Sequence, residues 1–154
     1  MFTPPRTSRR TLLTAGVALP AAALSAPLLA SPAAAAEPFE SGVVVQWKPV
    51  TLASDITVEG AHPQVRVVRV AGTEFLQLRG TIKGSFTADF QLGTLPDGVT
   101  TPKMTRGVCP RNSHNGLNTC RVEADIRGVI TILGARPESP ITWVQLDNFS
   151  SVMR

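Results

Sequence analysis

Residues 65–82 read VRVVRVAGTEFLQLRGTI and contain two runs rich in Val, Leu, Ile and Phe. The join between the runs, Ala-Gly-Thr-Glu, is short enough to fold the second run antiparallel onto the first, which predicts a β-hairpin. In the second run Leu76, Leu78 and Ile82 alternate with more polar residues, so we expect these side chains to face a core. Gly80 belongs to the same inward set, and a glycine there predicts a bulge with a local bend.

The chain after residue 42 repeats this pattern of short extended runs and turns. The other clear runs are VVVQW at 43–47, SFTADFQL at 85–92, MTRGVC at 104–109, CRVEADI at 120–126, VITIL at 129–133 and ITWVQLDNF at 141–149. In the run at 85–92 we expect one buried face made of Phe86, Ala88, Phe90 and Leu92. No stretch combines helical periodicity with caps. Eight or nine short strands separated by turns predict an all-β protein, an antiparallel and jelly-roll-like β-sandwich.

Residues 1–36 have the features of a signal peptide, which leaves 37–154 as a single β-sandwich domain. A basic start is followed by a run of Ala, Leu and Val, and small residues at 34–36 provide a cleavage site. The segment around Arg9 and Arg10 resembles the twin-arginine (Tat) export signal of bacteria, with Leu residues in the following apolar positions. We therefore expect a secreted, extracellular bacterial protein.

The composition argues against a membrane or a nucleic acid as partner of the mature domain. A membrane anchor at the N-terminus is disfavoured because Pro20 and Pro27 interrupt the apolar run, and no later segment is long and apolar enough to span a bilayer. Three of the fifteen Lys and Arg residues lie in the signal peptide, so twelve remain against eleven acidic residues, a net charge of +1. The remaining basic residues are scattered, whereas nucleic acid requires a concentrated positive face.

The two cysteines, Cys109 and Cys120, flank one polar stretch with the sequence PRNSHNGLNT. An exported protein reaches an oxidising compartment, so we expect these two cysteines to form a disulfide, with two free thiols as the alternative. A zinc site is disfavoured, because the spacing provides neither four ligands nor a close pair of ligands. No metal or other cofactor is expected.

The polar stretch at 110–119 is the candidate for recognition, because its compact hydrogen-bonding groups would lie on a loop stapled by the disulfide. Such a loop can bind a polyol or a peptide, and Asn115-Gly116 is available for positive φ. The alternative interpretation is an ordinary solvated hairpin loop. The predicted ligand-binding residues are Arg111, Asn112, His114, Asn115 and Asn118.

Trp47 and Trp143 allow a second interpretation based on stacking of an exposed indole on a sugar. Each lies in a β-like run, however, and tryptophan in a small sandwich is more often a core or interface residue. The pattern favours the core or interface for both.

The sequence contains no signature of an enzyme. His62 and His114 are the only histidines, and neither accompanies a nucleophile elbow, a paired-carboxylate motif or a metalloprotease helix. Hydrolysis by two of the eleven carboxylates stays open as an alternative, because their spacing in three dimensions is not fixed by the sequence. We predict a non-catalytic protein.

Several of these motifs together resemble a known family. They are WKPVTL at 47–52, the hairpin at 65–82 with its Leu-Arg-Gly followed by an apolar strand, LPDG at 95–98, VEADIRGVITI at 122–132, and ITWVQLDNF at 141–149. This layout resembles the C-terminal β-sandwich, the receptor-binding head, of bacteriophage tail-fibre and baseplate proteins. The resemblance covers residues 47–149 and implies a trimeric, jelly-roll-like head that recognises cell-surface saccharides.

Two features depart from that family, namely an export signal in place of a fibre stem and a cysteine-bounded loop. They indicate a domain that acts as a free secreted protein. The predicted function is therefore a secreted, non-catalytic binding module for a glycan or another cell-surface component. The alternatives are a structural or assembly protein that acts through its own homo-oligomer interface, and a small secreted enzyme.

Overall fold

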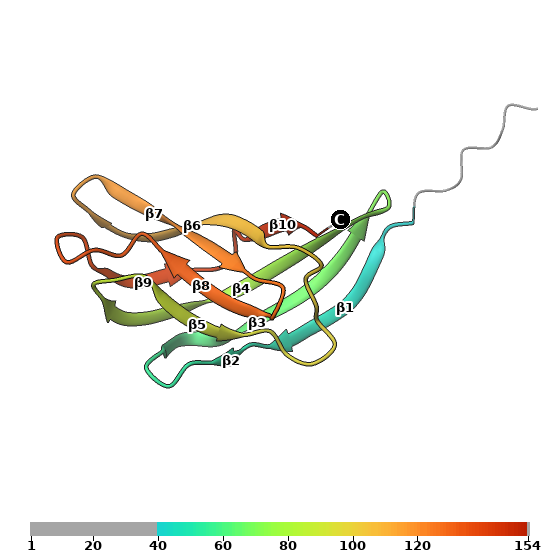
Figure 1. The fold of residues 1–154 in the computed structure, drawn as a ribbon, viewed down its shortest axis with the longest axis horizontal. Coiled ribbons are helices and arrows are strands. Elements are labelled where there is room, and N and C mark those ends of the chain that lie inside the picture. The colour runs from blue at the N-terminus through green and yellow to red at the C-terminus, as the bar shows by residue number, and fades with distance from the viewer. Residues whose placement is uncertain (1–39, 154) are drawn as a thin grey trace, which may run out of the picture. The chain divides into compact units, whose positions relative to one another are not determined.

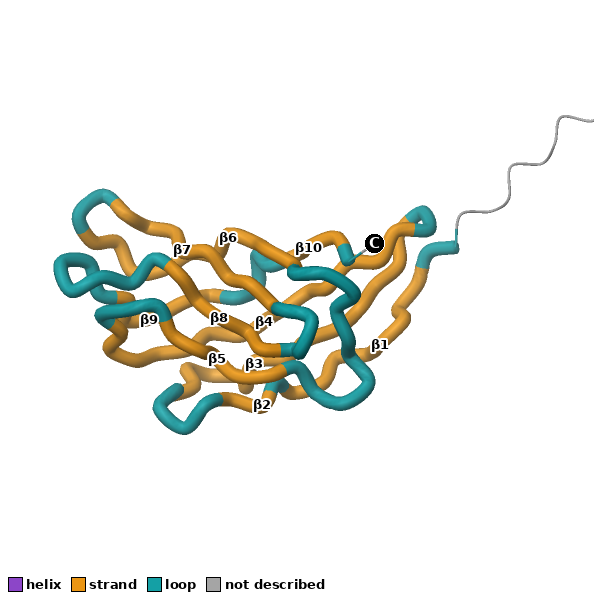
Figure 2. Tube along the Cα trace, viewed as in Figure 1, coloured by secondary structure: helices purple, strands orange, loops and turns teal. Residues whose placement is uncertain are grey.

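The computed structural model describes residues 40–153, and the predicted export signal lies outside this range. All regular elements within the range are β-strands (Figure 2). They are β1 (Gly42–Pro49), β2 (Thr51–Leu52), β3 (Thr57–Val70), β4 (Thr73–Phe86), β5 (Phe90–Thr94), β6 (Thr105–His114), β7 (Leu117–Ala124), β8 (Val129–Leu133), β9 (Ile141–Gln145) and β10 (Ser150–Val152). This part of the chain therefore contains no helix of the length and apolarity needed to span a membrane.

The strands form two facing antiparallel layers (Figure 1). Sheet A has the order β1-β3-β4-β9, with β10 also pairing with β4, and sheet B has the order β6-β7-β8-β5-β2. The layers are joined where Arg111 of β6 pairs with Val144 of β9, and where the chain passes through Val50 from β1 into β2. The predicted all-β, antiparallel β-sandwich is confirmed.

The hairpin predicted at 65–82 is confirmed and extends further at both ends as β3 and β4, each 14 residues long. Ala71 and Gly72 form its two-residue turn with φ of +48° and +80°, the geometry that matches the right-handed twist of the flanking strands. Leu76, Leu78 and Ile82 are all buried, with exposed fractions of 0–1%. Strand periodicity therefore identified the inward face of β4 correctly.

The bend predicted at Gly80 is also present, although the extra residues belong to the opposite strand. Gln64 pairs with Arg79 and Glu59 with Thr81, so the ladder skips residues 60–63 of β3. Gly80 has a φ of +108°, and a Cβ there would lie 3.0 Å from the Pro63 Cα. The glycine thus permits a close approach of the bulged strand.

The core lies between the two sheets and is apolar. Its fully buried side chains come from both layers and include Val65, Leu76, Leu78, Ile82, Leu92, Val122, Ile130, Ile132, Ile141 and Val144. Trp47 and Trp143 are not among the core residues, because both are half-buried on the outer face of sheet A. Of the two places that the sequence favoured for the tryptophans, the core is thus ruled out, and an interface stays a prediction.

The run at 85–92 is not the single strand that its alternation predicted. Strand β4 ends at Phe86, β5 begins at Phe90, and Ala88 between them is exposed. Here the chain leaves sheet A and enters sheet B, and the Asp89 Oδ1 accepts a hydrogen bond of 2.6 Å from the Gly134 backbone N–H. Residues 87–89 therefore form a corner, which we call the β4–β5 corner.

Candidate functional site

The polar stretch predicted as a binding loop is a β-hairpin. Strand β6 continues to His114 and β7 begins at Leu117, so only Asn115 and Gly116 lie in the turn. Their φ values of +49° and +77° are those of a tight two-residue hairpin turn, as the Asn-Gly pair allows. The polar residues consequently alternate between two faces and do not gather on one loop.

Arg111 is buried, with an exposed fraction of 2%, which is unusual for an arginine. Its Nη1 donates to the Gly134 carbonyl at 3.0 Å, and its Nη2 donates to the carbonyls of Ser139 at 3.0 Å and Pro140 at 2.7 Å. It also donates to the Ser139 hydroxyl at 3.2 Å and, through Nε, to the Asn112 carbonyl at 3.3 Å. All three guanidinium nitrogens of Arg111 therefore bond to the protein itself, and in this structure the side chain is not accessible to a ligand.

Two asparagines fasten the hairpin to the same segment, residues 134–140, which we call the β8–β9 loop. The Asn112 Nδ2 donates to the Pro140 carbonyl at 3.0 Å, and its Oδ1 accepts from the Thr142 N–H at 2.8 Å. The Asn115 Nδ2 donates to the Glu138 carbonyl at 2.7 Å. Of the five predicted binding residues, His114, Asn115 and Asn118 are exposed near the hairpin tip, and Asn115 is the one of these three that bonds to the β8–β9 loop.

Cys109 and Cys120 are register partners in the β6–β7 ladder, with exposed fractions of 0% and 5%. In the structure both are free thiols, so the expected disulfide is not present in it. Burial raises the pKa of the Cys109 thiol to about 12, and the neighbouring Cys120 and Asp147 add to the shift. Burial also raises the pKa of Cys120 to about 11, with Arg111 acting weakly in the opposite direction. Both thiols are therefore protonated at neutral pH and poorly nucleophilic.

These raised pKa values predict a loss of stability in alkaline solution under reducing conditions. Unfolded thiols ionise near their ordinary pKa of 9.0, whereas the folded thiols keep their protons until about 11 or 12. The contribution of the two protonated thiols to the free energy of unfolding is fully present below pH 9.0 and is lost as the pH rises through the folded pKa values. Urea titrations across this pH range should show that the free energy of unfolding falls more steeply with pH for the natural protein than for the Cys109→Ala, Cys120→Ala double variant. Equal slopes would contradict the raised thiol pKa values.

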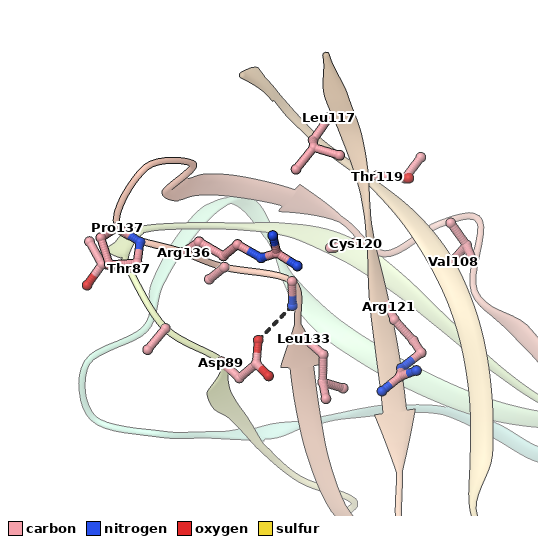
Figure 3. Close-up of a pocket in the computed structure, with 13 residues that line it drawn as sticks. Thr87, Asp89, Val108, Leu117, Thr119, Cys120, Arg121, Leu133, Arg136 and Pro137 are labelled. Atoms are coloured by element: carbon pink, nitrogen blue, oxygen red, sulfur yellow. Dashed lines mark hydrogen bonds between the residues drawn. The ribbon is translucent and has the colours of Figure 1, made fainter. Parts of the chain in front are cut away.

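A groove with a volume of about 910 Å³ opens on the outer face of sheet B, and we call it the outer groove (Figure 3). Its floor is a cross-strand row in which Val108 pairs with Arg121 and Arg121 with Leu133. Leu117 and Thr119 extend the floor along β7 toward the hairpin tip. The β8–β9 loop and the β4–β5 corner form the walls, so three separate parts of the chain build the site.

The outer groove combines apolar surface with positive charge. Val108 and Leu117 are 61% and 44% exposed there, which is high for aliphatic side chains. The Arg121 Nε lies 3.1 Å from the Glu123 carboxylate, so this cation is partly neutralised. Arg136 extends from the β8–β9 loop toward the centre of the groove (Figure 3), and it forms no ion pair with any residue between 40 and 153. The groove therefore presents one unpaired guanidinium beside an apolar floor.

None of the five predicted ligand-binding residues lines the outer groove, although the hairpin that carries them forms part of its floor. In the run CRVEADI at 120–126, Arg121 lies between the buried Cys120 and Val122, so its place on the outer face is the part of the groove that strand alternation could have indicated. The contribution of Arg136 depends on how the β8–β9 loop folds back over sheet B. Within the described residues, no group of three or more His, Cys, Asp or Glu side chains is arranged to hold a metal ion.

Comparison with known proteins shows similarity in three dimensions only. Neither a protein-family model nor a curated protein matches the sequence. The receptor binding protein (gp15) of Listeria phage PSA superposes with a TM-score of 0.53 at 17% sequence identity, over 74% of this chain and 67% of that one. The head domain of the lactococcal phage bIL170 superposes with a TM-score of 0.43 at 17% identity, over 69% and 94% of the two chains. The superposition on the Listeria phage protein confirms the resemblance to phage receptor-binding proteins as a likeness of fold.

Proposed function

We propose that this chain is a secreted, non-catalytic binding module that holds a glycan or another cell-surface component in the outer groove. The observation that carries the proposal is the groove itself, an open surface of aliphatic side chains with an unpaired guanidinium at its centre. The fold shared with a phage receptor binding protein supports the same class of function. Secretion rests on the signal peptide read from residues 1–36.

The groove offers the groups that a sugar requires. Val108, Leu117 and Leu133 provide apolar surface for the C–H face of a pyranose ring. The Arg136 guanidinium and the Thr119 hydroxyl provide directional hydrogen bonds to sugar hydroxyl or acidic groups. Because Arg111 and two asparagines tie the β8–β9 loop to the hairpin, the wall that carries Arg136 is ordered before a ligand arrives, which lowers the entropic cost of binding.

The lining of the groove favours binding over hydrolysis. Asp89 is the only carboxylate among the residues that line it, and one oxygen of that carboxylate already accepts the Gly134 N–H. Glycoside hydrolysis by two acids requires a second carboxylate across the ligand. The groove thus supports recognition without cleavage.

The proposal predicts that changes in the groove weaken attachment to bacterial cell envelopes. We expect Arg136→Gln or Leu117→Ser to raise the dissociation constant in an envelope pull-down about tenfold, because each removes a directional bond or apolar contact worth about 1.4 kcal/mol. The matched control is Lys103→Gln, which removes a charge from an exposed loop away from the groove. Equal binding by the groove variants and the natural protein would refute the assignment.

A second candidate function, assembly through a homo-oligomer interface, is favoured by one specific surface. Val43, Val68, Phe75 and Val152 are successive register partners on the outer face of sheet A, where they form an apolar row across four strands. We infer that a second copy of the chain covers this row, with the trimer of the resembled family as the expected state. Light scattering at micromolar concentration should then give a multiple of the monomer mass that Phe75→Lys reduces to one, and a natural protein that is strictly monomeric would exclude this candidate.

A further inference from the structure

The outer face of sheet A carries a second cluster, built from Trp47 of β1, Arg66 of β3 and Arg79 of β4. The Cζ atoms of both arginines lie over the Trp47 ring, at 4.6 Å for Arg66 and 4.3 Å for Arg79 from the ring centroid. These are distances at which a guanidinium is attracted to the negative face of an indole. The two guanidiniums are therefore fixed within about 9 Å of each other by one shared ring.

Two glutamines complete the cluster through the register of β3 and β4. Arg66 pairs with Gln77, and Gln64 with Arg79, so all four side chains share one face. The Arg66 Nε donates to the Gln77 Oε1 at 2.7 Å, and the Arg79 Nε donates to the Gln64 Oε1 at 2.8 Å. Gln77 is held in turn by the Ser150 hydroxyl at 3.4 Å. The orientation of both guanidiniums is thus set by uncharged partners.

The absence of carboxylates around these two arginines distinguishes them from others on the surface. Arg69, Arg106, Arg121 and Arg127 each form an ion pair with Glu or Asp. Within residues 40–153, Arg66 and Arg79 have no carboxylate partner, and nothing accepts a hydrogen bond from either Nη of Arg66. An anion that reaches the free donors of these guanidiniums would therefore meet no competing carboxylate of the described residues.

We propose that Arg66 and Arg79, oriented by Trp47, form an anion-binding site for the sulfate or phosphate groups of an anionic polysaccharide. The free guanidinium donors can form paired hydrogen bonds with such oxyanions, a geometry that lysine does not provide. A polysaccharide fits better than nucleic acid, because a single pair of cations is too small a positive surface for a duplex backbone. The site lies on sheet A and the outer groove on sheet B, so this inference does not depend on ligand binding in the groove.

Trp47 provides a direct optical readout of this site. The chain has two tryptophans, so a Trp143→Phe background leaves Trp47 as the only indole. Titration with dextran sulfate should change the Trp47 emission saturably, whereas uncharged dextran should leave it unchanged. Polyphosphate serves as a second probe, and tighter binding by either polymer identifies the preferred oxyanion and supports the site. An unchanged emission with both polymers would overturn the proposal.

Substitutions distinguish a specific anion-binding site from nonspecific electrostatic attraction to the protein surface. We expect Arg66→Gln, Arg79→Gln to weaken dextran sulfate binding at least tenfold, and the matched double variant Lys103→Gln, Arg127→Gln, with the same loss of charge, by less than twofold. Arg66→Lys, Arg79→Lys keeps the charge but loses the planar donors and should also weaken binding about tenfold. Three results would show general charge attraction and overturn the proposal. The matched control could lose as much affinity for dextran sulfate as the glutamine variant, or the lysine variant could bind dextran sulfate as tightly as the natural protein. A single-stranded oligonucleotide could also bind as tightly as dextran sulfate. Thermal unfolding confirms that each variant is folded.

Discussion

Replacing Arg111 with Met lowers the free energy of unfolding by about 2–4 kcal/mol, because a buried charged donor and its hydrogen bonds to neutral acceptors are lost. Met replaces the aliphatic part of the Arg111 side chain but has no counterpart of the guanidinium, so the loss combines the missing hydrogen bonds with the space left empty. The Ser139 and Pro140 carbonyls each keep a second donor, the Arg136 N–H and the Asn112 Nδ2, but they lose their bonds to the guanidinium. The Gly134 carbonyl loses the Arg111 Nη1, and an acceptor left unpaired away from water costs about 1–3 kcal/mol. Urea unfolding followed by circular dichroism measures the effect.

The control for this prediction is Lys103→Met, which changes an exposed loop residue and should alter stability by no more than about 0.5 kcal/mol. Arg111→Lys should lower the free energy of unfolding by an amount between those of the control and Arg111→Met, because an ammonium retains the charge but cannot reach all of the acceptors. A loss below about 1 kcal/mol for Arg111→Met would mean that the guanidinium does not hold the β8–β9 loop. Since Arg136 lies on that loop, the Met variant should also bind envelopes less tightly.

Gly93→Ala disrupts the contact that brings β2 onto sheet B and costs about 3 kcal/mol or more, at the upper end of the range for overpacked sites. Gly93 pairs with Leu52 in the β2–β5 ladder. An added Cβ would meet the Thr51 carbonyl oxygen and lie 2.9 Å from the Leu52 Cα, and both are backbone atoms that cannot move aside as a flexible side chain does. Hydrogen exchange should show faster exchange in β2 along with the lower stability.

Gly42→Ala is the matched control for Gly93→Ala, because a Cβ at Gly42 meets no atom within 4 Å. We expect its stability to stay within about 0.5 kcal/mol of the natural protein. If Gly93→Ala changed the free energy of unfolding as little as Gly42→Ala, β2 would not be packed against β5 as closely as the structure shows.

The sequence predicted the parts of the fold that depend on local periodicity. The hairpin of β3 and β4 was identified from its alternating residues, because a strand with one buried face repeats every two residues. Ala88 shows the limit of that reasoning, since the alternation continues through the β4–β5 corner while the chain changes sheet. Periodicity reports which face a residue would occupy in a strand, but it does not report where the strand ends.

The candidate site was less predictable for a physical reason. Polar residues such as Arg111 and Asn112 suggested a solvated loop, yet their side chains are used to satisfy the backbone carbonyls of a loop more than 20 residues away in the chain. Such pairings depend on tertiary contacts that leave no local signal. The outer groove likewise needs the β6–β7 hairpin, the β8–β9 loop and the β4–β5 corner to meet, so its residues were identified only in three dimensions.

The most direct measurement of the central claim is a residue-resolved nuclear magnetic resonance titration of the protein with solubilised glycan from bacterial cell envelopes. If the outer groove binds the glycan, the largest shifts of backbone amide signals will come from Val108, Leu117, Thr119, Leu133 and Arg136. Arg136→Gln will reduce those shifts, and Lys103→Gln will not. Saturable shifts confined to other surfaces, with the groove signals unchanged, would contradict the assignment of the outer groove as the binding site.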